Sequence, residues 1–428
     1  MNHMKNTRWL NRNIVAMGIT SLFSDASHEM STATLPSFLT ELVGAAAAPG
    51  MLGLISGLSD ASASLVKIFS GWFSDKLGRR KPLSVLGYLL TGVFVGITGF
   101  AKSWFEVLIY RSLAWIGRGT REPPRDALLA DSVNEAYYGR AFGFHRAMDT
   151  LGAIIGPLAA FLLIPLIGFR NIFFLSFVPG GLAVLAISLG VKENGRQLRS
   201  QVKSLAWHVK SLPREFRVFL FIMFVFGVGN FNRTLLLLRV QEVLTPVSGL
   251  IIAGAMAILL YTTRNVAQAL ADYGAGALSD RIGKKIPLAI LGFLLFGVTC
   301  VGFAYATTNL LYFVLLFVLS GVSAATYTAL EKAYAADLLP PDVRGTGYGV
   351  LNTVDGIGDF VSSFIVGSLW MVFSSKIAFL YGAGLSFVAA FLLIGIGSRH
   401  VVAEGGTFVA VKNQQFNTMN LQARYHEA

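Results

Sequence analysis

The sequence predicts an all-α integral membrane protein with twelve transmembrane helices, arranged as two pseudo-symmetric six-helix bundles. Of its 428 residues, 54% are hydrophobic and only 14% are charged, whereas a soluble domain has about 25% charged residues. Apolar runs of roughly 20 residues, the length that crosses the hydrocarbon core of a bilayer, follow one another along the chain. A charged motif also occurs twice, once in each half of the chain. A membrane β-barrel would instead show alternating segments of about ten residues.

The apolar runs divide the chain into four parts. We expect an N-terminal six-helix bundle over residues 1–191, a polar and basic linker over 192–216, a C-terminal six-helix bundle over 217–397 and a polar tail over 398–428. The expected spans are 14–42, 50–74, 83–101, 104–131, 141–167 and 171–191 in the first bundle, and 217–241, 249–279, 287–306, 309–336, 346–373 and 377–397 in the second.

The distribution of charge predicts the orientation in the membrane. Lys and Arg residues gather before the first span and after the second, fourth, sixth and eighth spans, whereas the opposite links carry little charge. Basic residues mark cytoplasmic loops, so we expect both termini, the linker and the tail in the cytoplasm of a bacterial inner membrane. This placement also accounts for the net charge of +12 without a nucleic-acid partner. The single cysteine, Cys300, offers neither an intramolecular disulfide nor a metal-binding pair.

The repeated motif shows that the two halves are related. The segment "GWFSDKLGRRKPL" begins at Gly71 and the segment "GALSDRIGKKIPL" begins at Gly276, 205 positions later. Near residue 140 the offset becomes 206, so that Asp131 corresponds to Asp337 and Asp149 to Asp355. Two parallel six-helix repeats are typical of a transporter, with the substrate site between them near the middle of the membrane.

These segments resemble the loop signature G-x-x-x-D-[RK]-x-G-R-[RK] of the major facilitator superfamily (MFS), and the resemblance covers almost the whole chain. It implies the MFS fold, transport by alternating access, no enzymatic activity, no cofactor or metal, and a monomer. It further implies that a motif cluster holds the cytoplasmic helix ends together when the carrier faces outward. The alternative is that these residues only anchor the chain on the cytoplasmic side. The candidate gating residues of this cluster are Gly71, Asp75, Gly78, Arg79, Arg80, Asp131, Asp280 and Gly283.

The fifth span carries a second resemblance. In "GFHRAMDTLGAIIGPLAA", Gly143, Gly152, Gly156 and Pro157 match the spacing found in the antiporters of the superfamily, with Ala160 where a final glycine is usual. This match implies proton-driven export. Small residues that let helices pack closely are the alternative explanation. Asp149 and its counterpart Asp355 either pair with cations, which would be gating, or face the substrate.

Charged residues inside spans are candidate functional residues because their burial in a membrane is costly. Asp25 and Glu29 lie one turn apart in the first span, with His28 beside them, and Asp60 and Lys67 share a face of the second span. Adjacent carboxylates in a cavity favour a proton site, and we expect Lys67 to hold one of these carboxylates charged. The alternative is a static salt-bridge network.

Deep cations favour an anionic substrate. Arg111, Arg233 and Arg264, together with Asn230, are the candidate substrate-binding residues, because arginine suits the bidentate capture of a carboxylate or phosphate. In the fourth span we expect Pro123 and Pro124 to kink or unwind the helix, and Arg125 to pair with a nearby aspartate or a lipid head group.

The sequence therefore predicts a secondary transporter that exports a small anionic or carboxylate-bearing molecule in exchange for protons. The alternatives are uptake of an anionic metabolite or siderophore by proton symport, and multidrug efflux. The sequence has no phosphate-binding loop for ATP, and its scattered histidines do not favour a membrane enzyme. The expected partners are the small-molecule substrate, protons and membrane lipids.

Overall fold

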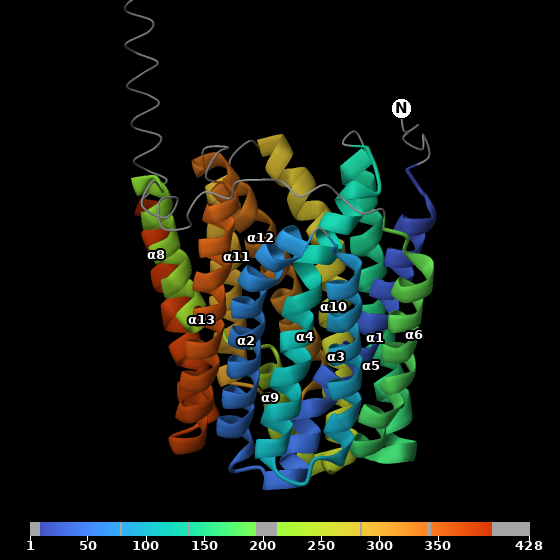
Figure 1. Ribbon diagram of the computed structural model, residues 1–428. Helices are drawn as coiled ribbons and strands as arrows, with labels where there is room; N and C mark the ends of the chain where they lie inside the picture. Colours follow the sequence, from blue (N-terminus) through green and yellow to red (C-terminus); the bar gives the residue numbers. More distant parts are fainter. Residues whose placement is uncertain are drawn as a thin grey trace, which may run out of the picture.

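The computed structural model describes residues 9–77, 79–134, 137–193, 212–282, 285–339 and 344–395. The described residues form helices that stand side by side, without a strand among them (Figure 1). These helices are α1 (Arg12–Val43), α2 (Ala48–Leu77), α3 (Lys81–Ile97), η1 (Thr98–Phe100), α4 (Trp104–Asp131), α5 (Tyr138–Leu175), α6 (Phe177–Leu185), η3 (Ala186–Gly190), α8 (Arg214–Gly229), α9 (Thr234–Ser248), α10 (Leu250–Ile282), α11 (Lys285–Ala304), α12 (Leu310–Leu338), α13 (Arg344–Val372) and an unlabelled last helix, Ser375–Gly395.

Hydropathy supports an all-helical membrane protein. In the described part of the chain, eight helical stretches are long and apolar enough to cross a membrane. One of them, Arg140–Gly190, covers two predicted spans, because the backbone turns at Gly168 with a φ of 75°, a conformation that favours glycine. Helices α1, α4 and α13 are as long but carry more polar residues, so the number twelve stays a prediction. The proposed linker and tail lie largely outside the described residues.

The internal repeat is visible in the helix ends. Gly44 ends α1 with a φ of 80° and Gly249 ends α9 with a φ of 78°, and these two glycines are 205 positions apart in the sequence. Ser103 caps the start of α4 and Asn309 caps the start of α12, each accepting backbone N–H bonds, and they are 206 positions apart. The two halves therefore use the same local signals at corresponding places.

The seventh predicted span, 217–241, is not continuous, which corrects the sequence prediction. The helix stops after Gly229 and restarts at Thr234. The freed backbone groups find partners, since Ser362 donates to the Asn230 carbonyl at 3.0 Å and the Asn232 N–H donates to Ser363 at 3.0 Å. Broken helices at membrane depth are tolerated where neighbours satisfy the backbone and a cavity is lined. The interruption between α8 and α9 is therefore stabilised by specific hydrogen bonds and belongs to the fold.

The fourth span is not unwound by its prolines, which corrects a second expectation. Helix α4 runs unbroken through Pro123 and Pro124. Pro124 has no N–H for the carbonyl of Thr120, one turn earlier, and that carbonyl instead accepts a hydrogen bond from Ser70 of α2 at 2.5 Å. Helix α2 thus replaces the bond that the proline removes.

The two halves meet along two seams. Helix α2 lies along α13 and α5 lies along α10, as the blue and orange and the green and yellow ribbons of Figure 1 show. Glycines allow the first seam to close: a Cβ added at Gly53 would overlap the Ser363 carbonyl oxygen, and one at Gly57 would crowd Phe360. Close packing of this kind is the main attraction between helices in a membrane.

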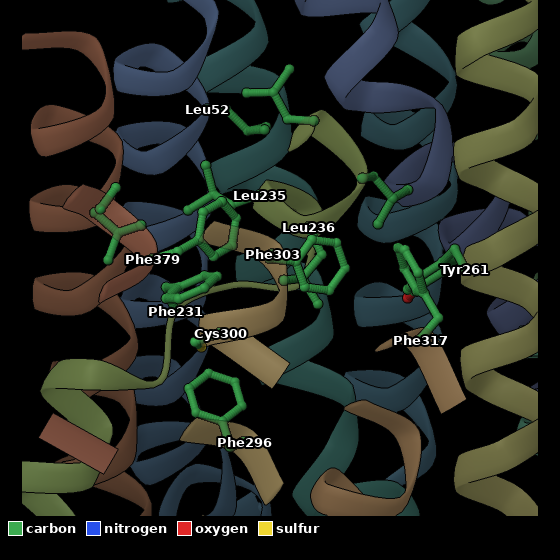
Figure 2. Close-up of a cluster of buried hydrophobic side chains, with 14 of the residues drawn as sticks. Leu52, Phe231, Leu235, Leu236, Tyr261, Phe296, Cys300, Phe303, Phe317 and Phe379 are labelled. Carbon is green, nitrogen blue, oxygen red and sulfur yellow. The ribbon is translucent and has the colours of Figure 1, made fainter. Parts of the chain in front are cut away.

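An aromatic core lies in the C-terminal half, next to the α8–α9 break (Figure 2). Phe303 is completely buried and packs against Phe379 and Phe317 with ring centroids 5.6 and 5.4 Å apart. Phe231, just after the α8 end, joins this core through Phe379 at 5.3 Å. These ring contacts therefore fix the position of the broken segment.

The glycines of the fifth span pack against α1. A Cβ at Gly156 would overlap the Ala26 carbonyl oxygen, whereas a Cβ at Gly143 would meet nothing within 4 Å. We expect Gly156→Ala to lower the free energy of unfolding by about 1–3 kcal/mol, because overpacking forces the helices apart. Gly143→Ala is the matched control, and it should be neutral or slightly stabilising because alanine favours a helix. Thermal unfolding of both purified variants in detergent measures the difference, and equal unfolding temperatures would contradict this prediction.

Candidate substrate site between the two halves

A cavity of about 220 Å³ lies between the halves at the level of the α8–α9 break. Both halves contribute charged, polar and aromatic side chains to its wall. It is lined by Thr32, Asp60, Arg111, Trp115, Arg118, Asn230, Phe231, Asn232, Arg233, Leu236, Arg264, Phe296, Ser320, Ala324, Tyr327 and Asp359. The four predicted substrate-binding residues are therefore brought together in one cavity.

Arg111 reaches this cavity from α4. It is only 4% exposed, its guanidinium lies 3.9 Å from the centroid of the Trp115 ring, and its Nε has no hydrogen-bond partner among the described residues. Stacking on an aromatic face holds the guanidinium in place without using up its N–H donors. Arg111 is therefore positioned to donate to a ligand.

Arg264 reaches the same cavity from α10 of the other half. It is 6% exposed and donates to Ser320 at 3.1 Å and to Gln268 at 2.9 Å, both of which are neutral. Within the part of the chain that the structure describes, neither Arg264 nor Arg111 has a carboxylate within the 4.0 Å of an ion pair. The cavity thus holds two buried cations without a fixed counter-ion.

Arg233 differs, because it is paired across the halves. Its guanidinium donates to Glu29 of α1 at 2.7 Å, and Tyr261 of α10 donates to the other Glu29 oxygen at 2.6 Å. Glu29 is 5% exposed, and His28 lies 3.3 Å away through Nε2. The Glu29 carboxylate therefore joins one half of the protein to two residues of the other.

Asp60 makes a similar connection from α2. It accepts a hydrogen bond from Trp115 at 2.6 Å within its own half and one from Asn232 at 2.7 Å across the halves. Lys67 does not hold Asp60 or the acids of α1, which corrects the sequence prediction: its ammonium pairs with Glu122 of α4 at 2.7 Å. Glu122 also pairs with Arg118 at 2.8 Å, since α2 and α4 pack side by side.

A second cavity, of about 400 Å³, lies above the first, towards the end of the bundle where α4 ends and α5 begins. Arg118 and Arg233 line both cavities. Acidic and basic side chains dominate the upper wall, which includes Asp25, Glu29, Lys67, Arg125, Arg146, Asp149 and Asp272. Glu29 and Arg233 therefore stand between a central chamber and an upper one.

The two acids of α1 have different surroundings. Asp25 contacts only residues of its own half, His28 at 3.4 Å and Arg121 at 3.9 Å. His28 thus lies between both carboxylates, as a neighbour of each. Arg121 is itself held by Ser24 and by the Tyr88 ring, 4.3 Å from its guanidinium.

The lower end of the bundle is closed between the halves. Ser37 of α1 donates to Gln241 of α9 at 3.0 Å, and Ser56 of α2 contacts Thr234 of α9 at 3.1 Å. Glu29 and Asp60 also form hydrogen bonds across the halves, as described above. Together, these contacts join α1 and α2 of the first half to α9, α10 and the α8–α9 break of the second. The described conformation therefore has its larger cavity above the central site and hydrogen-bonded contacts below it.

The predicted gating residues are only partly described. Arg80 pairs with Asp131 at 2.5 Å, which ties the start of α3 to the end of α4, and a Cβ on Gly71 would touch Pro123 at 3.5 Å. Arg79 is exposed. Gly78 and Gly283, and the side chains of Asp75 and Asp280, lie outside the described residues.

The acids and small residues of α5 surround the α1 contact. Asp149 accepts a hydrogen bond from Ser21 and lies 3.4 Å from His145, and it lines the upper cavity. A Cβ at Gly152 would overlap the Leu22 carbonyl, next to Asp25, and Pro157 lies one position after Gly156 inside α5. Asp355 is half-buried in α13. Arg125 pairs with Asp126 at 2.8 Å, one of the two partners expected.

Sequence analysis missed three residues of the site. Asp359 follows Asp355 by four positions in α13, the same spacing as Asp25 and Glu29, and this pattern could have identified it. Tyr261 and Tyr327 gave no signal, because an isolated tyrosine in an apolar span is common. Tyr327 accepts a hydrogen bond from Asn230 at 3.1 Å.

The comparison with known families gives the identity of this architecture. The family model of the Major Facilitator Superfamily matches residues 17–260 and 221–406. The chain belongs to this superfamily. It is therefore a multi-pass membrane transporter of small molecules and not an enzyme.

Three relatives with similar sequences are named as transporters or as a multidrug resistance protein. An uncharacterized MFS-type transporter of Methanocaldococcus jannaschii is 34% identical over 398 residues, 92% of this chain and 96% of that protein. The multidrug resistance protein MdtG of Escherichia fergusonii is 26% identical over 66% of this chain and 70% of its own. The cis,cis-muconate transport protein of Acinetobacter baylyi is 22% identical over 74% of this chain and 78% of its own.

A solved MFS structure has the same fold. The nucleoside transporter NupG superposes with a TM-score of 0.74 at 13% identity, covering 89% of this chain and 98% of its own. The two-bundle architecture predicted from the internal repeat is therefore confirmed at the level of fold.

Proposed function

We propose that this protein exports a small carboxylate-bearing molecule across a bacterial inner membrane in exchange for protons. The observation that carries the proposal is the pair Arg111 and Arg264, which face one cavity from opposite halves and are buried without a carboxylate partner in the described part of the chain. Unpaired charges at membrane depth are costly, so a bound anion would offset that cost. Two guanidinium groups also suit bidentate recognition of a carboxylate.

The orientation follows from the basic loops. With the start of α1 and the link after α2 on the cytoplasmic side, the upper end in Figure 1 faces the cytoplasm, and we propose that both termini lie on that side. The described conformation would then be inward-facing, with Asp149 near the entrance. In the opposite conformation, we propose that the Arg80–Asp131 region and the repeated motif hold the cytoplasmic helix ends together.

Proton coupling is proposed for Glu29, with Asp25 and Asp60 as neighbouring carboxylates. The Glu29 carboxylate binds Arg233 and Tyr261 of the other half, so a proton on Glu29 would remove the charge that holds Arg233. Lys67 contributes indirectly, because its partner Glu122 also binds Arg118 beside the cavity. The protein would work as a monomer among membrane lipids.

Uptake by proton symport is the second candidate. The name of the muconate relative refers to a dicarboxylate, which supports an anionic cargo in either direction, whereas the multidrug resistance relative and the glycines of α5 favour export. A siderophore cargo stays a prediction.

Proteoliposomes loaded with a pH-sensitive dye test the proposal. We expect a carboxylate gradient, for example of muconate or benzoate, to drive proton movement in the direction opposite to the carboxylate, with empty liposomes as the control. Proton movement in the same direction as the carboxylate would instead establish symport, and the lack of any carboxylate flux across a panel of such acids would overturn the proposal.

A further inference from the structure

Asp359 is a carboxylate of the central cavity without a fixed partner. It lines the cavity from α13, and within the described residues its side chain has no hydrogen bond or ion pair. The other acid of the cavity, Asp60, is already bonded to Trp115 and Asn232. The cavity therefore presents one available acid as well as two available arginines.

The charge balance of the cavity shows what kind of ligand completes it. Arg233 is neutralised by Glu29, and Arg118 shares Glu122 with Lys67 of the upper cavity wall. What remains is the pair Arg111 and Arg264, Asp60 with its neutral donors, and Asp359. A purely anionic ligand would satisfy the arginines but would leave Asp359 unpaired beside it, which is unfavourable in a poorly solvated site.

We propose that the substrate carries a cationic nitrogen as well as a carboxylate, and that Asp359 binds this nitrogen while Arg111 and Arg264 bind the carboxylate. The inference rests on the proposed function and specifies its substrate class, an amino-carboxylate. Aromatic walls formed by Trp115, Phe296 and Tyr327 suit an apolar or aromatic group between the two charged ends.

This assignment also makes binding of the substrate sensitive to protons. A carboxylate holds either a proton or an ammonium group, so protonation of Asp359 and binding of the substrate nitrogen exclude one another, a competition that supports the antiport proposed through Glu29. An anion without a cationic group would instead bind better when Asp359 is protonated, which would favour symport. The charged and titratable groups that face Asp359 are Asp60 and Lys67 of α2, Arg233, Asp355 of its own helix and Tyr327 of α12.

Matched sets of ligands test the proposal on the purified full-length protein. Each set shares one skeleton: an amino-carboxylate, its deaminated acid and its decarboxylated amine, for example phenylalanine, 3-phenylpropionate and 2-phenylethylamine, with aliphatic and larger aromatic sets beside them. Thermal stabilisation and equilibrium binding are measured for wild type, Asp359→Asn and Glu41→Gln. Glu41 is an exposed acid at the lower end of α1 and is the control for loss of one negative charge.

We expect the amino-carboxylate to bind at least about tenfold more tightly than its deaminated acid in wild type and Glu41→Gln. The reason is that the deaminated acid cannot form the charge-assisted hydrogen bond to Asp359. Asp359→Asn should remove this preference and leave binding of the deaminated acid unchanged or tighter, which also shows that the variant is folded. Equal binding of both acids in wild type, or a preference that survives Asp359→Asn, would overturn the inference while leaving carboxylate transport intact. If no carboxylate of either kind binds, the proposed function fails together with it.

Discussion

Glu29→Gln is expected to abolish proton movement and to weaken the closure between the halves. Glutamine has nearly the same shape but cannot take up a proton, and it leaves Arg233 without its counter-ion. Removing one partner of a buried ion pair is strongly destabilising. We expect a cost of about 3 kcal/mol, the low end of the usual range, because the Arg233 side chain is 34% exposed and can still be solvated. Separation of the halves at the lower end would expose Arg233 to water and so recover part of this free energy.

Cysteine labelling measures this separation. The only cysteine, Cys300, is completely buried, so Cys300→Ala provides a thiol-free background for Ser37→Cys at the closed lower end. In membranes, Glu29→Gln should raise the labelling rate of this thiol by about tenfold or more, since each 1.4 kcal/mol changes a population tenfold.

Asp25→Asn is the matched control for labelling. Asp25 lies one turn from Glu29 but contacts only its own half, through His28 and Arg121. Its replacement should therefore leave the labelling rate at position 37 unchanged. If Glu29→Gln and Asp25→Asn give the same rate, or if proton movement persists in Glu29→Gln, the Glu29–Arg233 pair is a structural contact and not the coupling site.

Arg111→Gln and Arg264→Gln are each expected to lower the carboxylate kcat/KM by about 100-fold, since loss of one buried charged partner costs about 3 kcal/mol. Among the described residues, neither arginine has a carboxylate within ion-pair distance, so neither change should lower the unfolding temperature, and each is expected to raise it slightly. Flux in proteoliposomes and thermal unfolding are measured together. Arg111→Lys and Arg264→Lys should recover only part of the loss, because lysine lacks the planar fork.

Arg121→Gln separates binding from stability. Arg121 is 1% exposed and is held by Ser24, the Tyr88 ring and Asp25, so its replacement should lower the unfolding temperature. For Arg111 and Arg264 we expect lost flux with retained stability. This combination identifies residues that bind a ligand and do not stabilise the fold. Lower stability in all three variants would place Arg111 and Arg264 among the structural residues instead.

The fold was predictable because its signals are local and repeated. The apolar runs occur in both halves, and the charged motifs and the glycines that end α1 and α9 recur 205 positions apart, so each half supports the interpretation of the other. The site was predictable as a set of charges, since a membrane leaves few reasons to bury Arg111, Arg264 or Glu29. The partners that these charges find across the two halves were not predictable, because they depend on which residues face each other after folding.

Two corrections illustrate this limit. Lys67 and Asp60 share a helical face, but Lys67 lies nearer to Glu122 of the neighbouring α4, a relation that spacing within α2 cannot show. Pro123 and Pro124 predicted an interruption, yet the helix continues, while the real interruption at Asn230 follows two glycines and no proline. In both cases the deciding contact comes from another helix.

The closed lower end has a consequence for the speed of transport. Side-chain bonds from Ser37, Ser56, Asp60 and Glu29 to the opposite half must break together whenever the protein turns to the other side of the membrane. At about 1 kcal/mol each, they add a barrier that is the same for every cargo. Reorientation, and not release of the cargo, would then set the turnover number, so different cargoes would share similar kcat values and differ mainly in KM.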